Sequence, residues 1–300
     1  MRASLRALLE GLIDYAGLFP PAKLPMQEAL ANYRRYREGE AAGMLGRFVC
    51  PAAWLKDIPP GDAMTCSALA RGGDSAEAFL AGLDADLADI EASQVRVEAL
   101  EAKLPGAALA DTLQAASVID QTLRRLKPRG LSVFFEAPVS EALALGRVVS
   151  PLHALADLDQ VAGFKLRAGG LEAVSFPSSL HVAQAMHLCH SADVPLKATA
   201  GLHHPLPRFD TAVQARMHGF VNFFIAGVLI RARGLTMNRV VELLDDDDPA
   251  SFVFTDDELR WRDVTATTEE VREARRTAMI SFGSCSFDEP RDDLRALGWL

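Results

Sequence analysis

Two lysines lie within short apolar segments that have the composition of buried strands. Lys165 belongs to residues 163–168 and Lys197 to residues 195–202, and each segment runs into a glycine. A lysine is rarely buried without a partner or a function, because removing an ammonium group from water is costly. Burial or a neighbouring cation also lowers the pKa of a lysine and frees its amine for attack. The pair therefore predicts a site whose chemistry needs an amine.

Other strand-like segments carry polar residues in similar positions. Alternate residues of a strand share one face, so these polar residues are predicted to share an interior with the two lysines. Opposite charges in such an interior offset each other's desolvation, and the plain alternative is a structural ion-pair network. The residues predicted to face the interior are Asp14, Ala16, Phe48, Cys50, Arg96, Glu98, Leu100, Phe134, Glu136, Lys165, Arg167, Lys197, Thr199 and Asn222.

The elements that position these residues are strands that alternate with amphipathic helices. This alternation favours a parallel sheet with crossover helices, and eight repeats match an α/β fold of the (β/α)8 TIM barrel type. No GxGxxG follows the first strand, which disfavours an open doubly wound sheet. Residues 1–250 are predicted to form the barrel and residues 251–300 a C-terminal helical extension packed on it. The eight predicted strands are 12–19, 46–53, 64–70, 95–103, 131–138, 163–168, 195–202 and 219–226.

In this fold the active site lies at the C-terminal ends of the strands. A deprotonated lysine there attacks a carbonyl and forms a Schiff base, whose iminium accepts electrons when an adjacent C–C bond is made or broken. Lys165 and Lys197 are both candidate nucleophiles. Glu98, Glu136 and Asp14 are candidate proton shuttles. We therefore expect an aldolase or lyase acting on a small polar metabolite.

This arrangement resembles the class I, Schiff-base aldolases, and most of all the deoxyribose-phosphate aldolase family. That family is a (β/α)8 barrel with an iminium-forming lysine in its sixth strand and a second lysine in its seventh. Asp14, Cys50, Glu98, Lys165 and Lys197 fall on the strands where the family has its acids, cysteine and lysines, in the same order. The resemblance implies that Lys165 forms the Schiff base and that Lys197 depresses its pKa. The family has a Gly/Ser-rich phosphate loop after its eighth strand, and the residues that follow the predicted eighth strand here, 227–230, are poorly suited to bind phosphate.

The loops that follow the sixth and seventh strands add further candidates. Arg167 with the Gly169 and Gly170 amides is suited to bind a carboxylate or phosphate, although Gly-Gly alone also turns a chain. His203 and His204 directly follow the seventh strand, where histidines are general acid/base candidates. A surface turn fixed by the neighbouring prolines is the alternative. Thr199, Asn222 and Cys50 complete the predicted substrate-binding set.

Two other functions remain open. The first is a divalent-metal-dependent barrel lyase or hydrolase, with Asp14, Glu98, Glu136, His203 and His204 as ligands. The second is a non-catalytic barrel that binds a metabolite. The Schiff-base mechanism itself needs neither a cofactor nor a metal.

The composition excludes several classes of protein. The 300 residues carry a net charge of −9, whereas a nucleic-acid partner requires a basic surface. The four cysteines show no CxxC spacing, as expected of reduced thiols, and the segment around Cys285 lacks a GxSxG motif. The first twenty residues do not have the pattern expected of a signal peptide, and no apolar run of about 18 residues is found, so we expect no membrane span. We expect a cytoplasmic enzyme with a small-molecule substrate and no membrane partner, which can form a homo-oligomer.

Overall fold

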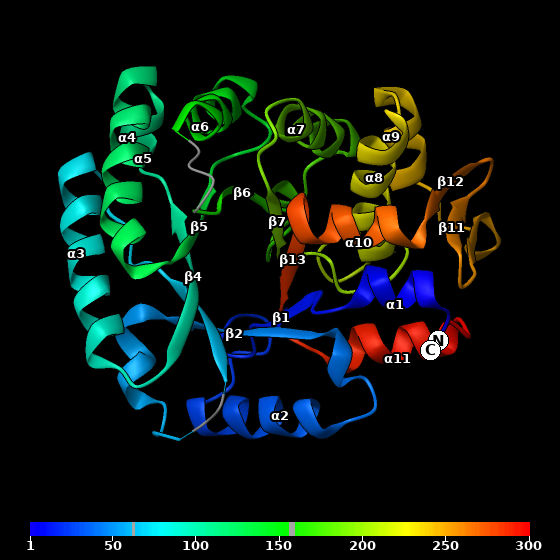
Figure 1. Cartoon of the computed structure of the whole chain (residues 1–300), viewed down its shortest axis with the longest axis horizontal. Helices are drawn as coiled ribbons and strands as arrows, with labels where there is room; N and C mark the ends of the chain where they lie inside the picture. The colour runs from blue at the N-terminus through cyan, green and yellow to red at the C-terminus, as the bar shows by residue number, and fades with distance from the viewer. Residues whose placement is uncertain (62–63, 156–159) are drawn as a thin grey trace.

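Eight parallel strands form a closed barrel in the computed structural model, which describes residues 1–61, 64–155 and 160–300. The order around the barrel is β1-β13-β7-β6-β5-β4-β3-β2, so the predicted (β/α)8 TIM barrel is confirmed. Figure 1 shows helices arranged around the outside of these strands. The barrel strands are β1 (Ile13–Tyr15), β2 (Leu45–Pro51), β3 (Thr65–Leu69), β4 (Arg96–Lys103), β5 (Ser132–Glu136), β6 (Ala162–Arg167), β7 (Leu196–Thr199) and β13 (Met279–Ser284).

The surrounding helices begin at side chains that cap their free N–H groups. Ser75, Asp111 and Ser178 each accept a hydrogen bond from a backbone N–H in the first turn of the helix that follows, and Thr267 forms a capping box with Glu270. None of the described helices is long and apolar enough to cross a membrane. The helices are α1 (Ala3–Leu9), α2 (Met26–Glu38), α3 (Ala76–Ala92), α4 (Gly106–Leu109), α5 (Thr112–Leu126), α6 (Ala142–Leu155), α7 (Ser179–Ser191), α8 (Phe220–Arg233), α9 (Met237–Leu244), α10 (Thr268–Thr277) and α11 (Asp288–Ala296).

Aromatic packing between α2 and the first strands fixes which residues face the barrel interior. The ring of Tyr15 lies 5.3 Å from that of Tyr36 and 6.1 Å from that of Phe48, and Tyr33 lies 5.5 Å from Phe48. Phe48 therefore faces the helix layer, and the prediction that it faces the interior is wrong. Because side chains alternate along a strand, Asp14 points away from this cluster and into the barrel.

The predicted eighth strand, 219–226, is instead the beginning of α8. Its residues 220–230 are all buried, and a run that is apolar on every side carries no periodicity to separate a helix from a strand. The eighth strand is β13, which lies between β1 and β7 and pairs Gly283 with Asp14 on one side and Thr199 on the other. Figure 1 shows β13 between these two strands.

The final fifty residues are therefore part of the barrel, and the predicted division at residue 250 is wrong. Between β7 and β13 the chain forms the hairpin β8 (Arg208–Asp210) and β9 (Ala215–Met217), then α8 and α9. A three-stranded antiparallel sheet and α10 follow, and the chain continues after β13 into α11. The small sheet consists of β10 (Phe252–Phe254), β11 (Glu258–Trp261) and β12 (Val264–Thr267).

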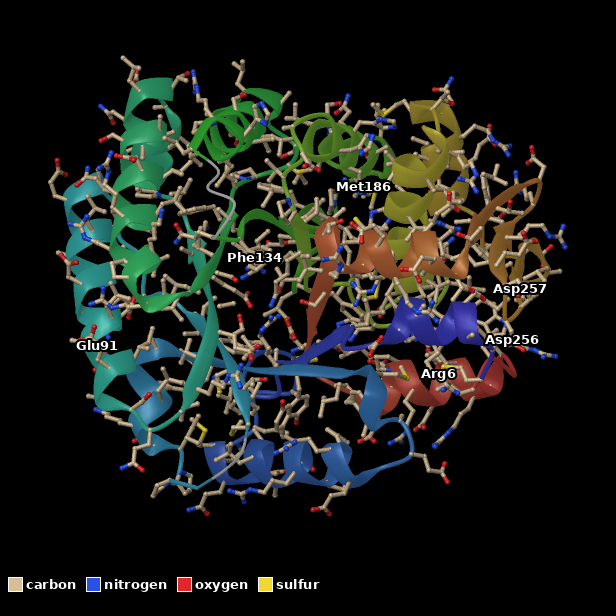
Figure 2. All side chains as sticks on the ribbon, viewed as in Figure 1. Arg6, Glu91, Phe134, Met186, Asp256 and Asp257 are labelled. Carbon is tan, nitrogen blue, oxygen red and sulfur yellow. The ribbon has the colours of Figure 1, made fainter. Side chains whose placement is uncertain are left out.

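Side chains project into the space enclosed by the strands, as Figure 2 shows. Phe134 of β5 is almost wholly buried, whereas Glu91 near the end of α3 lies on the outside. A Cβ atom at Gly163, on the neighbouring strand β6, would come within 2.7 Å of the Phe134 ring. The glycine thus makes room for a large side chain, which is consistent with a packed interior rather than a pore.

Candidate active site in the barrel mouth

A pocket of about 1010 Å³ opens where the barrel strands end. This is the C-terminal face of the barrel, where barrel enzymes place their active sites. Side chains from several strands and from the loops that follow them border the pocket. Among them are Glu101, Glu136, Lys165, Arg167, Thr199 and His203.

Lys165 lies at the floor of this pocket between two carboxylates. Its Nζ is 2.8 Å from Oε2 of Glu101 and 3.2 Å from Oε2 of Glu136. The side chain is 4% exposed, yet it borders the pocket. The strand register explains the contact with Glu136, because β5 and β6 pair these two residues directly. The amine is therefore both held by acids and reachable from the pocket.

Lys197 lies on the adjacent strand opposite Lys165, but it is fully buried and does not border the pocket. Its Nζ contacts Oδ2 of Asp14 and lies 2.5 Å from Oε1 of Glu101. Burial alone would lower the pKa of Lys197, but Asp14 and Glu101 together raise it above its ordinary value. Lys197 is therefore a sealed cation rather than a free amine.

Glu101 bridges the two lysines. Burial alone would raise the pKa of Glu101, but Lys165 and Lys197 hold it well below its usual range, so the side chain is a carboxylate. The Ser67 hydroxyl donates a further hydrogen bond of 2.6 Å to Oε1. The carboxylate thus has partners on β3, β6 and β7, and it couples the sealed lysine to the one at the pocket floor.

Strand alternation does not predict Glu101 as an inward residue. The pairing of β3 with β4 shifts by one residue, because Cys66 lies opposite Val97 whereas Ser67 lies opposite Ala99. Such a β-bulge at Glu98 reverses the alternation that follows. The prediction that Leu100 faces the interior is wrong, since Glu101 does. The available signal was a lone acid within an apolar stretch, residues 99–102.

Asp14 lies beneath the pocket rather than in its wall. Besides Lys197, it accepts hydrogen bonds from the Arg47 backbone N–H at 2.6 Å and from the Ser281 hydroxyl at 2.7 Å. Ser281 belongs to β13, so the strand that sequence patterns missed also supplies a partner to this acid. Asp14 is consequently positioned to neutralise Lys197 and not to touch a molecule in the pocket.

Arg167 and Glu136 form a pair at the pocket wall. The Arg167 Nε is 2.8 Å from Oε1 of Glu136 and its Nη2 is 3.4 Å from Oε2, while about half of the arginine side chain stays exposed. Burial alone would raise the pKa of Glu136, but Lys165 and Arg167 lower it. Thr199 lies opposite Arg167 in the register and also borders the pocket.

The two glycines after β6 have different positions. Gly170 borders the pocket, whereas Gly169 packs where a Cβ would collide with the Phe176 ring and with Gly201. Gly169 therefore serves the close approach of two loops. Only Gly170 of this pair can contribute to binding a molecule in the pocket.

The two histidines after β7 are also separated by their surroundings. His203 borders the pocket, and its Nδ1 is 3.0 Å from Oε2 of Glu289. His204 does not border it, and its Nδ1 is 2.5 Å from Oδ2 of Asp293. Both acids belong to α11, so the C-terminal helix holds the loop after β7 in place.

The structure does not bring Glu98, Asn222 and Cys50 to the pocket. Glu98 lies near the start of β4 and pairs with Arg47 and Arg96 at 3.1 and 3.2 Å. Asn222 lies in α8, where its amide donates hydrogen bonds to the carbonyls of Leu243 and Asp246. Cys50 shares the outward face of β2 with Phe48, and its thiol donates to the Pro51 carbonyl.

The five predicted metal ligands do not gather at one point. Asp14 binds Lys197, Glu98 binds arginines near the start of β4, and the two histidines bind acids of α11. Within residues 1–61, 64–155 and 160–300, no group of three or more His, Cys, Asp or Glu side chains is arranged to hold a metal ion.

Lys103 and Cys285 also border the pocket, although neither was among the predicted site residues. Lys103 borders the pocket at the end of β4, two residues beyond Glu101. Cys285 borders it directly after β13, and burial raises the pKa of its thiol above the ordinary value. Cys285 was not predicted as a site residue, because β13, the strand that it follows, was not predicted.

The fold and site together define a (β/α)8 barrel with a lysine at the floor of its mouth. The sequence matches no protein-family model and no curated protein. Among solved structures, the fold is similar to that of the tetrameric deoxyribose phosphate aldolase from Aeropyrum pernix, with a TM-score of 0.48 and 16% sequence identity. The match covers 68% of this chain and 85% of that one.

Proposed function

We propose that this chain is a Schiff-base enzyme of the aldolase type, which makes or breaks a C–C bond next to the carbonyl of a small polar metabolite. One observation carries the proposal. The Lys165 amine lies at the floor of a pocket of about 1010 Å³, within 3.2 Å of two carboxylates. A nearly buried lysine that a small molecule can still reach is the arrangement that amine catalysis requires.

Lys165 is the proposed nucleophile. Lys197 is fully buried, and its acidic neighbours raise its pKa, so its amine is neither accessible nor free. We assign Lys197 the role of a fixed positive charge that keeps Glu101 ionised.

The reaction begins when the Lys165 amine releases its extra proton to solvent in the pocket, and this proton is taken up again when water leaves the carbinolamine. The amine then attacks the substrate carbonyl, and loss of water from the carbinolamine gives an iminium. As the adjacent C–C bond breaks, its electron pair forms the C=C bond of an enamine and the C=N pair moves onto nitrogen, while the other fragment loses its hydroxyl proton and leaves as a carbonyl compound. A proton added to the enamine carbon restores the iminium, and water then hydrolyses it to release the second product and the Lys165 amine. The iminium is itself the electron sink, so the proposed reaction uses no further cofactor.

Arg167 supports a preference for substrates that carry a negative charge. A guanidinium has five N–H donors, and Glu136 accepts from two of the Arg167 nitrogens. The remaining donors are available on a side chain that is half exposed at the pocket wall. We propose that Arg167 and Thr199 orient a carboxylate or phosphate of the substrate.

Borohydride trapping tests this proposal directly. The protein is incubated with small aldehydes and ketones, reduced, and digested for mass spectrometry. The chain contains only six lysines, so each adduct can be assigned. We expect an adduct on Lys165 that is absent from Lys165→Met. Exposed Lys56 serves as the control for nonspecific labelling. Equal labelling of Lys56 and Lys165, or full activity in Lys165→Met, would overturn the proposal.

A further inference from the structure

Two imidazole–carboxylate pairs join the loop after β7 to α11, and they differ in their access to the pocket. His203 pairs with Glu289 and borders the pocket, whereas His204 pairs with Asp293 and does not. The two pairs connect the same loop to the same helix. A purely structural contact needs no opening to the pocket, so the accessible pair raises the question of a chemical role.

The His203 ring is held by one nitrogen and open at the other. Its Nδ1 is 3.0 Å from Oε2 of Glu289, and no side chain or carbonyl in the described part of the chain bonds its Nε2. A carboxylate that accepts the Nδ1–H fixes the tautomer in which Nε2 carries a free lone pair. The hydrogen bond from His203 also lowers the pKa of Glu289, so this acid stays ionised.

His204 shows the contrasting arrangement. Its Nδ1 is 2.5 Å from Oδ2 of Asp293 and its Nε2 is 3.7 Å from Oε1 of Glu289, so a carboxylate faces each nitrogen. Its side chain is 5% exposed, against 16% for His203. His204 therefore holds the loop to α11, and because it does not border the pocket, neither of its ring nitrogens can reach a molecule there.

The proposed reaction needs a base that the lysine network does not supply. Each of the two acids contacts two cations. Glu101 contacts Lys165 and Lys197. Glu136 contacts Lys165 and Arg167. Carboxylates held in this way bind a proton weakly. Removing a proton from carbon requires a stronger base, and a neutral imidazole provides one near neutral pH.

We infer that His203 is the catalytic residue that moves the proton at the carbon next to the iminium, and that Glu289 is its positioning residue. Nε2 takes the proton from this carbon, the C–H electron pair becomes the C=C bond of an enamine, and the iminium nitrogen accepts the displaced pair. In the opposite direction Nε2–H returns the proton and restores the iminium. The inference rests on the proposed function, since the enamine forms only after Lys165 has formed the iminium.

Exchange of the α-hydrogens for deuterium isolates this step without knowledge of the natural substrate. Acetaldehyde, acetone and pyruvate are incubated with the protein in D₂O, and proton NMR follows the exchange. Positioned acid–base groups contribute factors of about 10²–10⁴, so His203→Ala is expected to slow exchange by roughly 10²-fold or more. Borohydride labelling of Lys165 should persist in this variant, and added imidazole should restore part of the exchange.

The neighbouring pair supplies a matched control. Glu289→Gln is expected to slow exchange by about tenfold, because outer partners of a functional histidine contribute roughly 10–100-fold at metal sites. Glu289→Asp should recover part of this loss. Asp293→Asn weakens the other contact between the same loop and helix, and its exchange rate should stay within about twofold of the wild type. Thermal melts check folding, and His203→Gln replaces His203→Ala if the latter is unstable.

The possible results separate this inference from the function on which it rests. Undiminished exchange in His203→Ala or His203→Gln, with Lys165 still labelled, would overturn the inference and leave the Schiff base standing. No Lys165 adduct in the wild type with any probe would remove the proposed function and the inference with it. Equal losses in Glu289→Gln and Asp293→Asn would show that Glu289 merely docks the helix.

Discussion

The pocket floor and the sealed cluster beneath it contain the same types of side chain but differ in access to solvent. The pocket floor consists of Lys165 and Glu136, which border the pocket, and the sealed cluster consists of Lys197, Asp14 and Ser281, which do not. Glu101 contacts the lysines of both. A lysine beside carboxylates is therefore available for reaction only where a molecule can reach it, and elsewhere it is a structural charge.

Replacing the lysine at the pocket floor should produce the largest effect on catalysis. Lys165→Met removes the proposed nucleophile, and we expect turnover to fall by at least about 10³-fold. Glu101 retains Lys197 and Glu136 retains Arg167 as partners, so the protein should remain folded. Steady-state kinetics and a thermal melt measure the two outcomes. Unfolding without any separate loss of turnover in the folded fraction would contradict the assignment.

Replacing the lysine of the sealed cluster should act on stability instead. Lys197→Met leaves Asp14 and Glu101 without their shared buried cation, and breaking a buried pair in this way costs about 3–5 kcal/mol. Urea unfolding measures the loss, with Lys56→Met as the exposed control. If Lys165→Met and Lys197→Met lowered stability equally, the distinction between the two regions would be wrong.

The barrel itself could be predicted from the sequence. Strands β1 to β7 each overlap a predicted segment, because short apolar runs alternate there with amphipathic helices. The prediction of the eighth strand failed for a physical reason. The apolar run that begins α8 is buried on all sides and resembles a strand. By contrast, β13 contains the polar Ser281 and the glycine Gly283, which interrupt its apolar pattern.

Only part of the candidate site could be predicted from the sequence in the same way. Lys165 and Glu136 stood out as charges on apolar strands, and strict alternation was enough to place them. Glu101 did not, because one bulge residue reverses the face of everything beyond it. Glu289 lies 86 residues from His203, and only the docking of α11 on the loop after β7 brings the two together.

The stability of the folded protein should depend on pH through both Glu101 and Lys197. The folded-state pKa of Glu101 is lowered, so its contribution to stability is present above the ordinary glutamate pKa of about 4.3 and is lost as pH falls below it. The pKa of Lys197 is raised, so its contribution is present below about 10.4 and is lost as pH rises through the raised value.

Urea unfolding as a function of pH tests both directions. Each group that exchanges a full proton on unfolding changes stability by roughly 1.4 kcal/mol per pH unit. We expect the acidic and alkaline losses to be smaller in Lys197→Met, in which Glu101 has lost one of its two lysines. An unchanged pH profile in that variant would show that other groups dominate.

The smallest effect is expected from an acid on the same strand as Glu101. Glu98 is partly exposed and pairs with Arg47 and Arg96, and such pairs contribute about 0–1 kcal/mol. Glu98→Gln should therefore leave turnover within about twofold of the wild type and lower stability by less than about 1 kcal/mol. Glu101→Gln makes the same chemical change three residues further along β4, and it should impair both properties because two buried lysines lose a negative partner. Steady-state kinetics and urea unfolding of the two variants show which acid of β4 contributes to catalysis. A larger loss of turnover in Glu98→Gln than in Glu101→Gln would mean that Glu98 faces the interior, as strict strand alternation predicts, and would contradict the bulge.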